Sequence, residues 1–259
     1  MMDVIILSAG QGVRLRPITY TTPKGLIPIN GVCVIDNLIK KISELEVNSV
    51  TLLTNKIFLK PYQNWKKNYT GSLKINIVLQ KDSPKHKKGT LRSIWYIIKK
   101  MKLKQDIFVC AVDNFFDCSL KPAYKFFKQK NQPLIVSYNT CDWEIATHHS
   151  VIKYHPDTKR ITYIFPKTST PGDTLCMTFL LFFTQKVGSY ISAYLDQKRN
   201  ADKVGYFFKW LKTKMPLYTY EIKNKKRFDI GNYYSLYKAK IAFGEKKVTL
   251  DKLQKGIIG

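Results

Sequence analysis

The first thirty residues combine a short apolar run with glycines and fixed positive charges. The run from Val4 to Leu7 has the length and β-branching of a buried parallel strand. Gly10 and Gly12 follow this run, and Arg14 and Lys24 come after them. Glycines let backbone N–H groups approach an anion closely, and the two cations can neutralise its charge. This segment therefore predicts a phosphate-binding loop.

A carboxylate follows the most apolar strand that we expect in the chain. Asp113 comes directly after residues 106–112, whose apolar character predicts a central strand. Ligands of open α/β sheets bind at the carboxyl ends of the strands, where a carboxylate can hold a divalent cation that bridges phosphates. Gly89-Thr90, at the start of an expected helix, is a third signal for the same edge. The alternative is that Asp113 only caps a helix or turn.

Strand and helix patterns alternate through the first half of the chain. Strands are expected over 4–7, 49–54, 73–79, 106–112 and 133–138, and helices over 34–45, 90–101 and 123–129, with a helix or loop over 59–69. This alternation predicts a Rossmann-like, doubly wound and mostly parallel α/β sheet.

The C-terminal half has a different pattern. A hairpin is expected over 150–154 and 160–165, strands over 174–183 and 217–221, and helices over 186–195, 203–212 and 235–243. We expect a single domain over 1–243 with an elaborated C-terminal half. Residues 244–259 form a polar tail with no clear pattern.

The chain is strongly basic, with 44 Lys and Arg against 18 Asp and Glu and a formal net charge of +26. One interpretation is nucleic-acid binding with salt-sensitive affinity. The other is a lysine-rich surface around a site for a small polyanion. Lysine pairs occur along the whole chain, and no recognition helix, zinc motif or aromatic platform accompanies them. We therefore expect a small-molecule substrate and no nucleic-acid partner.

The remaining composition indicates a soluble protein. The five cysteines are scattered and form no CxxC pair, so we expect reduced thiols with no metal or disulfide role. Asp3 is negatively charged at a position where a signal peptide carries positive charge. The longest apolar run, 175–183, is too short to span a membrane. We expect a cytoplasmic protein with no membrane partner. The sequence does not decide the oligomeric state, and a homo-oligomer is one of the options.

The order of these motifs resembles the sugar-1-phosphate nucleotidyltransferases, which include glucose-1-phosphate thymidylyl- and uridylyltransferases and N-acetylglucosamine-1-phosphate uridylyltransferases. Residues 7–29 resemble the family's opening pattern, LAAGxGTRLxPxTxxxPKxLxPI, with Val13 in place of the usual Thr. Gly89-Thr90, 112–114 and 228–234 resemble its later elements in the same order. The resemblance covers nearly the whole chain.

This resemblance implies that an NTP and a sugar-1-phosphate give an NDP-sugar and pyrophosphate. It implies a nucleotide-binding half over 1–140 and a sugar-binding half over 141–243. By the resemblance, the nucleotide is bound by Leu7, Ala9, Gly10, Gly12, Val13, Arg14, Gln80, Gly89 and Thr90, the sugar phosphate by Lys24, Asn114 and Lys167, and Mg²⁺ by Asp113 and Asp229. Arg14, Lys24 and Asp113 are the expected catalytic residues.

The resemblance also bears on the substrates. Gln80, in a Leu-Gln pair, is typical of members that use UTP or dTTP, because its amide both donates and accepts hydrogen bonds; alternatively it is only an exposed strand end. The sugar region departs from the family: Lys167 is present, but the Glu of the family's EKP element is absent, which leaves the identity of the sugar open. Glucose-1-phosphate and N-acetylglucosamine-1-phosphate are the leading candidates. A catalytically degenerate, nucleotide-sugar-binding regulatory subunit is the alternative, against which both metal carboxylates argue.

Overall fold

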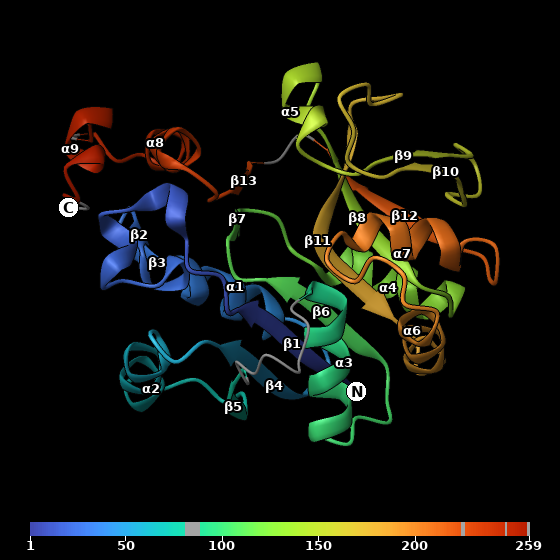
Figure 1. Cartoon of the computed structure of the whole chain (residues 1–259). Coiled ribbons are helices and arrows are strands. Elements are labelled where there is room, and N and C mark those ends of the chain that lie inside the picture. The colour runs from blue at the N-terminus through green and yellow to red at the C-terminus, as the bar shows by residue number, and fades with distance from the viewer. Residues whose placement is uncertain (81–88, 224–225, 247, 258–259) are drawn as a thin grey trace. The chain divides into compact units, whose positions relative to one another are not determined.

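The computed structural model describes residues 1–80, 89–223, 226–246 and 248–257. The chain forms two compact units. The glycine-loop unit comprises Val4–Lys81, Cys110–Leu120 and Lys225–Gly259. The hairpin unit comprises Met1–Asp3, Asp82–Val109 and Lys121–Asn224. Figure 1 labels the elements of both units. The chain thus enters each unit more than once.

The glycine-loop unit contains parallel strands that end beside one another. Its elements are most of β1 (Met2–Ser8), β2 (Pro28–Ile29), β3 (Val32–Cys33), α1 (Val34–Ile42), β4 (Val47–Thr54), α2 (Leu59–Lys67), β5 (Ile75–Leu79), the end of β6 (Ile107–Ala111), β7 (Asn114–Phe116), β13 (Arg227–Asp229), α8 (Tyr233–Ala242) and α9 (Leu250–Gln254). The strand order is β6-β1-β4-β5, and β13 pairs with β7 in a separate two-stranded sheet. Strands β4 and β5 are parallel, with Thr54 opposite Leu79.

The hairpin unit has a more mixed sheet. Its elements are α3 (Thr90–Lys100), the start of β6, α4 (Lys121–Lys130), β8 (Leu134–Asn139), α5 (Trp143–Thr147), β9 (Val151–Tyr154), β10 (Ile161–Phe165), β11 (Leu175–Phe183), α6 (Val187–Asp196), α7 (Val204–Leu211) and β12 (Tyr218–Ile222). The order is β10-β9-β11-β6, and β8 pairs with β11 and β12. Strands β9 and β10 are antiparallel, which confirms the expected hairpin.

The fold class predicted from the alternation of apolar patterns is confirmed: central, mostly parallel strands carry flanking helices. Helix α1 shows why the pattern works, because its apolar positions at three- and four-residue spacing are all buried. The helix ends at Ile42, earlier than the expected Leu45, and the amide of Ser43 bonds to the carbonyl of Ile39. No helix in the described parts of the chain has both the length and the apolar character needed to cross a bilayer.

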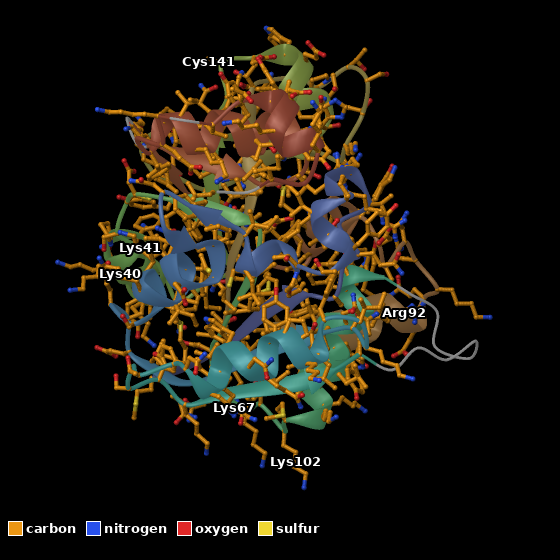
Figure 2. All side chains as sticks on the ribbon, turned by 90° about the vertical axis from the view of Figure 1, so that its left-hand side faces the viewer. Lys40, Lys41, Lys67, Arg92, Lys102 and Cys141 are labelled. Carbon is orange, nitrogen blue, oxygen red and sulfur yellow. The ribbon has the colours of Figure 1, made fainter. Side chains whose placement is uncertain are left out.

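Many of the lysine pairs lie at helix C-termini. Lys40 and Lys41 occupy the last turn of α1, Lys66 and Lys67 that of α2, and Lys99 and Lys100 that of α3. A cation in the last turn interacts favourably with the partial negative charge of the helix end. Figure 2 shows the labelled Lys40, Lys67 and Lys102 projecting from the ribbon. This placement gives part of the +26 charge a local structural reason.

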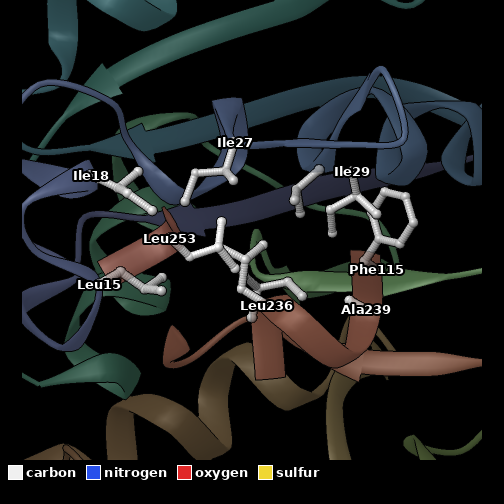
Figure 3. Close-up of a cluster of buried hydrophobic side chains, with 10 residues drawn as sticks. Leu15, Ile18, Ile27, Ile29, Phe115, Leu236, Ala239 and Leu253 are labelled. Carbon is white, nitrogen blue, oxygen red and sulfur yellow. The ribbon is translucent and has the colours of Figure 1, made fainter. Parts of the chain in front are cut away.

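The C-terminal segment is more ordered than its polar sequence indicated. It forms α9, whose N-cap Thr249 accepts a hydrogen bond from the amide of Lys252. Leu253 is fully buried and packs in a cluster with residues of the N-terminal loop and α8 (Figure 3). The other members are Leu15, Ile18, Ile27, Ile29, Val34, Phe115, Ile230, Leu236 and Ala239. A five-residue helix with one apolar anchor has too few positions to show a periodicity.

Leu253→Ala is expected to lower the free energy of unfolding by about 2–5 kcal/mol, because it removes a fully buried side chain and leaves a cavity. The matched control is Ile257→Ala, whose side chain is 54% exposed and should change the stability little. Urea unfolding followed by circular dichroism measures both. Equal stabilities for the two variants would show that α9 does not contribute to this core.

Candidate active site

The glycine loop begins where β1 ends, and its conformation requires glycine at one position. Gly12 has a φ of 65°, and a Cβ added there would lie 2.9 Å from Cγ2 of Thr19. The Thr19 hydroxyl donates a hydrogen bond to the carbonyl of Gly12 at 2.8 Å. At Gly10 an added Cβ would meet no described heavy atom within 4 Å. The loop is therefore closely packed against Thr19 at Gly12, whereas the space beside Gly10 is open.

Neighbouring strand ends place the loop and Gln80 at the same edge of the sheet. The Asn55 side-chain amide, just after β4, donates to the carbonyl of Ala9 at 3.0 Å. The backbone amide of Gln80, just after β5, donates to the carbonyl of Thr54 at 2.7 Å. At the other neighbouring strand, the amide of Val112 donates to the carbonyl of Leu7. The carboxyl ends of β1, β4, β5 and β6 thus converge, as open α/β sheets do at their ligand sites.

Lys24 and Asp113 form an ion pair. The Lys24 ammonium donates to Oδ2 of Asp113 at 3.0 Å, and the side chains are only 16% and 22% exposed. Lys24 begins a short 3-10 helix, Lys24–Leu26, while Asp113 follows β6. The amide of Ile230 donates to the Asp113 carbonyl at 2.8 Å, and Asp229 lies opposite Asn114 in the β13–β7 pair. Strand pairing therefore brings Asp229 to the Lys24–Asp113 pair.

Several charged side chains lie close enough to Asp229 to influence its pKa. Burial raises the pKa of Asp229 to about 6, and the charge of Asp113 adds to the rise. Arg227, Lys24 and Arg14 act in the opposite direction on that pKa. Gly231 lies beside this group, because a Cβ built on it would be 3.3 Å from Nη2 of Arg14 and 3.5 Å from Oδ1 of Asp229. Two carboxylates and three cations thus form one cluster within the glycine-loop unit.

Asn114, an expected sugar-phosphate contact, bonds to two other residues of the unit. It is fully buried, and its side-chain amide donates to the carbonyl of Ala111 at 3.1 Å. Its Oδ1 accepts a hydrogen bond from Nη2 of Arg227 at 2.6 Å. The nitrogen and the oxygen of the Asn114 side chain each form a hydrogen bond inside the unit. We therefore interpret Asn114 as a residue that holds Arg227. Arg227 was not among the expected site residues, although its position two residues before Asp229 puts both side chains on one face of a strand.

Three of the other expected site residues are in the second compact unit of the chain. Gly89, Thr90 and Lys167 belong to the hairpin unit. Gly89 has a φ of 153°, and a Cβ there would lie 3.0 Å from the backbone of Ala201, so the start of α3 is closely packed. Lys167 is exposed after β10, and Val13 is exposed in the glycine loop. The loop over 81–88, which follows Gln80, lies outside the described residues.

Asp229→Asn is expected to stabilise the substrate-free protein above pH 6. The folded-state pKa of Asp229, about 6, exceeds the ordinary value of 3.8, so folding favours the protonated form. Ionisation of the buried carboxyl therefore costs stability as the pH rises from about 4 to 6, and the cost stays constant above that. We expect a gain of about 2 kcal/mol for Asn at pH 8 and no gain at pH 4.

Urea unfolding in EDTA at pH 4, 6 and 8 measures this difference. The control is Asp157→Asn, because the Asp157 side chain is 88% exposed. The same stability difference between wild type and Asp229→Asn at all three pH values would show that burial does not perturb Asp229.

Comparison with known proteins agrees with this geometry. A family model described as nucleotidyl transferase matches residues 3–246. The UTP–glucose-1-phosphate uridylyltransferase AglF of Haloferax volcanii is 23% identical over 189 residues, which are 72% of this chain and 73% of AglF.

Two solved structures share the fold, each with a TM-score of 0.80. One, described as a glucose-1-phosphate thymidylyltransferase from Bacillus anthracis in complex with a sucrose, is 20% identical and covers 98% of this chain and 99% of its own. The other, a UDP-glucose pyrophosphorylase complexed with UDP-glucose, is 17% identical and covers 95% of this chain and 100% of its own. The chain therefore belongs to the nucleotidyl transferase family, and within it to the sugar-1-phosphate nucleotidyltransferases, as the resemblance of its motifs predicted.

Proposed function

We propose that this protein transfers a uridylyl or thymidylyl group from UTP or dTTP to a hexose-1-phosphate and releases pyrophosphate. Glucose-1-phosphate and N-acetylglucosamine-1-phosphate are the acceptors we favour. The observation that carries the proposal is the cluster of Lys24, Asp113 and Asp229 at the strand ends, beside Arg14 of the glycine loop. The relative AglF is described as acting on UTP and glucose-1-phosphate, which supports the choice of substrates.

The reaction needs alignment of two polyanions more than covalent chemistry. The sugar phosphate oxygen attacks the α-phosphorus, the bond to the β-phosphate breaks, and pyrophosphate leaves with the electron pair. Fixed cations that face the developing charge lower the barrier. We assign Arg14, which is exposed on the loop, to the neutralisation of the leaving pyrophosphate. We assign Lys24, which is partly buried, to the α-phosphate and the sugar phosphate.

The residues at this site fit a magnesium ion. Mg²⁺ prefers oxygen ligands and is commonly held by one or two carboxylates together with substrate phosphates. Asp113 and Asp229 supply two carboxylates, and burial, followed by the charge of Asp113, raises the pKa of Asp229. Within the described parts of the chain, no group of three or more His, Cys, Asp or Glu gathers to form an all-protein cage. Mg²⁺ would supply charge neutralisation at the reacting phosphates.

The remaining assignments follow the sheet edge. We propose that the backbone of the glycine loop, which follows β1, contacts the nucleotide phosphates. We propose that Gln80 contacts the base, because Gln80 follows β5, which is separated from β1 in the sheet only by β4. For the uracil or thymine edge, an amide offers one donor and one acceptor. The proposed nucleotide contacts are Leu7, Ala9, Gly10, Gly12, Val13, Arg14, Gln80, Gly89 and Thr90, and Lys167 is a proposed sugar-phosphate contact.

Pyrophosphate release tests this function. The full chain is mixed with Mg²⁺, one of five NTPs and one sugar-1-phosphate from a panel, with EDTA as the metal-free control. We expect turnover with UTP or dTTP at least about tenfold above the other NTPs, and none in EDTA. Silence across the panel would contradict the proposal. Binding of UDP-glucose without any turnover would instead identify a regulatory subunit.

A further inference from the structure

The hydroxyl of Tyr62 lies at a junction inside the glycine-loop unit. Tyr62 is on α2 and is fully buried. Its Oη is 2.5 Å from Oγ of Ser8, and the backbone N–H of Gly25 also bonds to it. A Cβ added to Gly25 would lie 2.6 Å from this Oη and 2.6 Å from Cγ2 of Val112. The segments of Ser8 and Gly25 therefore meet at one buried hydroxyl, and the side chain of Val112 packs beside Gly25.

Each of these segments leads directly to a group of the proposed site. Ser8 is the last residue of β1, immediately before the glycine loop. Gly25 follows Lys24 in the short 3-10 helix. Val112 precedes Asp113, which accepts the hydrogen bond from Lys24. Lys24 is thus next to backbone that packs on Tyr62, and Asp113 follows a residue whose side chain packs beside Gly25.

Helix α2 is itself tied to the glycine loop, so Tyr62 has a fixed position. Oδ1 of Asn55 accepts a hydrogen bond from the amide of Phe58, at the start of α2. The side-chain amide of the same Asn55 donates to the carbonyl of Ala9. The ring of Tyr62 also packs edge-on against Trp65, with centroids 6.5 Å apart. A hydroxyl on such a rigid support can set the position of the backbone that it contacts.

We propose that Tyr62, through its hydroxyl and Ser8, is a positioning residue that seats Gly25 and so aligns Lys24 with Asp113 for nucleotidyl transfer. The catalytic part of this inference rests on the proposed function. Small displacements of positioned groups reduce rates strongly, because the barrier depends on their alignment. Without the hydroxyl, the buried N–H of Gly25 and the hydroxyl of Ser8 would lose their shared partner.

Tyr62→Phe tests the hydroxyl while keeping the ring, and Ser8→Ala removes the other side of the contact. The matched control is Tyr154→Phe, which removes a hydroxyl that bonds to Glu221 at 2.9 Å in the hairpin unit. With the best NTP and sugar-1-phosphate pair of the wild type, we expect kcat of Tyr62→Phe to fall about tenfold, with KM for the NTP within about twofold. Ser8→Ala should lower kcat by less, and Tyr154→Phe should change neither constant.

Amide hydrogen exchange at Gly25, followed by NMR, provides a second measurement that does not depend on activity. We expect it to quicken about tenfold in Tyr62→Phe and to keep its wild-type rate in Tyr154→Phe. Wild-type kcat and wild-type Gly25 exchange in Tyr62→Phe would overturn the inference. If Tyr62→Phe does not fold, a wild-type kcat in Ser8→Ala would overturn it. If the wild type is inactive on every substrate, the proposed function fails, and Gly25 exchange alone decides whether Tyr62 holds this segment.

Discussion

Asp113→Asn is expected to lower kcat by about 10³-fold, which corresponds to about 4 kcal/mol of barrier. Asn has nearly the same shape and can still accept the hydrogen bond that Lys24 donates to Asp113. It carries no charge, so the pair of carboxylates that would hold Mg²⁺ is reduced to Asp229 alone. Most of the loss should therefore come from weaker metal binding in the reacting complex, and the fold should be preserved.

The measurement is pyrophosphate release at increasing Mg²⁺ concentration. We expect the Asp113→Asn variant to need more Mg²⁺ for half-maximal rate and to stay slow at saturation. Asp157→Asn is the control, because it removes a carboxylate that is 88% exposed in the hairpin unit. A kcat within about threefold of the wild type for Asp113→Asn would exclude this carboxylate from the reaction.

Lys24→Gln is expected to lower kcat by about 10²–10³-fold. Lys24 is a partly buried cation, so its interaction with a developing phosphate charge is less screened than at the surface. Gln keeps a hydrogen-bond donor of similar length but removes the charge. The variant also leaves the Asp113 carboxylate without its ion-pair partner.

Lys67→Gln is the matched control for this substitution, because Lys67 lies in the last turn of α2 and projects from the surface (Figure 2). Its kcat should equal that of the wild type. Since Lys24 and Asp113 are in contact at 3.0 Å, their effects should not add: the double variant should lose less than the product of the two single losses. Full additivity would indicate that the two groups act in separate steps.

Gly12, Lys24 and Asp113 stand in local patterns with direct chemical meaning, whereas Asp229 was expected from the family resemblance. The structure brings Lys24, Asp113 and Asp229 together. Arg227 was missed, because its role depends on the pairing of β13 with β7, two short strands that are far apart in the chain. No local pattern signals such a pairing.

Tyr62 and α9 show the same limit. A tyrosine in a polar helix pattern gives no sign that its hydroxyl will meet Ser8 and Gly25 from other segments. Likewise, the apolar anchor of α9, Leu253, finds its partners in the N-terminal loop and α8. Asn114 has a motif position that implies a phosphate contact, and its burial and its bond to Arg227, which depend on strand pairing, were not visible in the sequence. Tertiary contacts decide these roles, and local sequence does not contain them.

Transfer of label from [α-³²P]UTP to glucose-1-phosphate tests the central claim, that the Lys24–Asp113–Asp229 cluster performs nucleotidyl transfer. The wild type and Asp113→Asn are compared at equal concentration with Mg²⁺. The account predicts labelled UDP-glucose from the wild type and, in Asp113→Asn, a rate lower by about three orders of magnitude. Labelled UDP-glucose formed at equal rates by both proteins would contradict it.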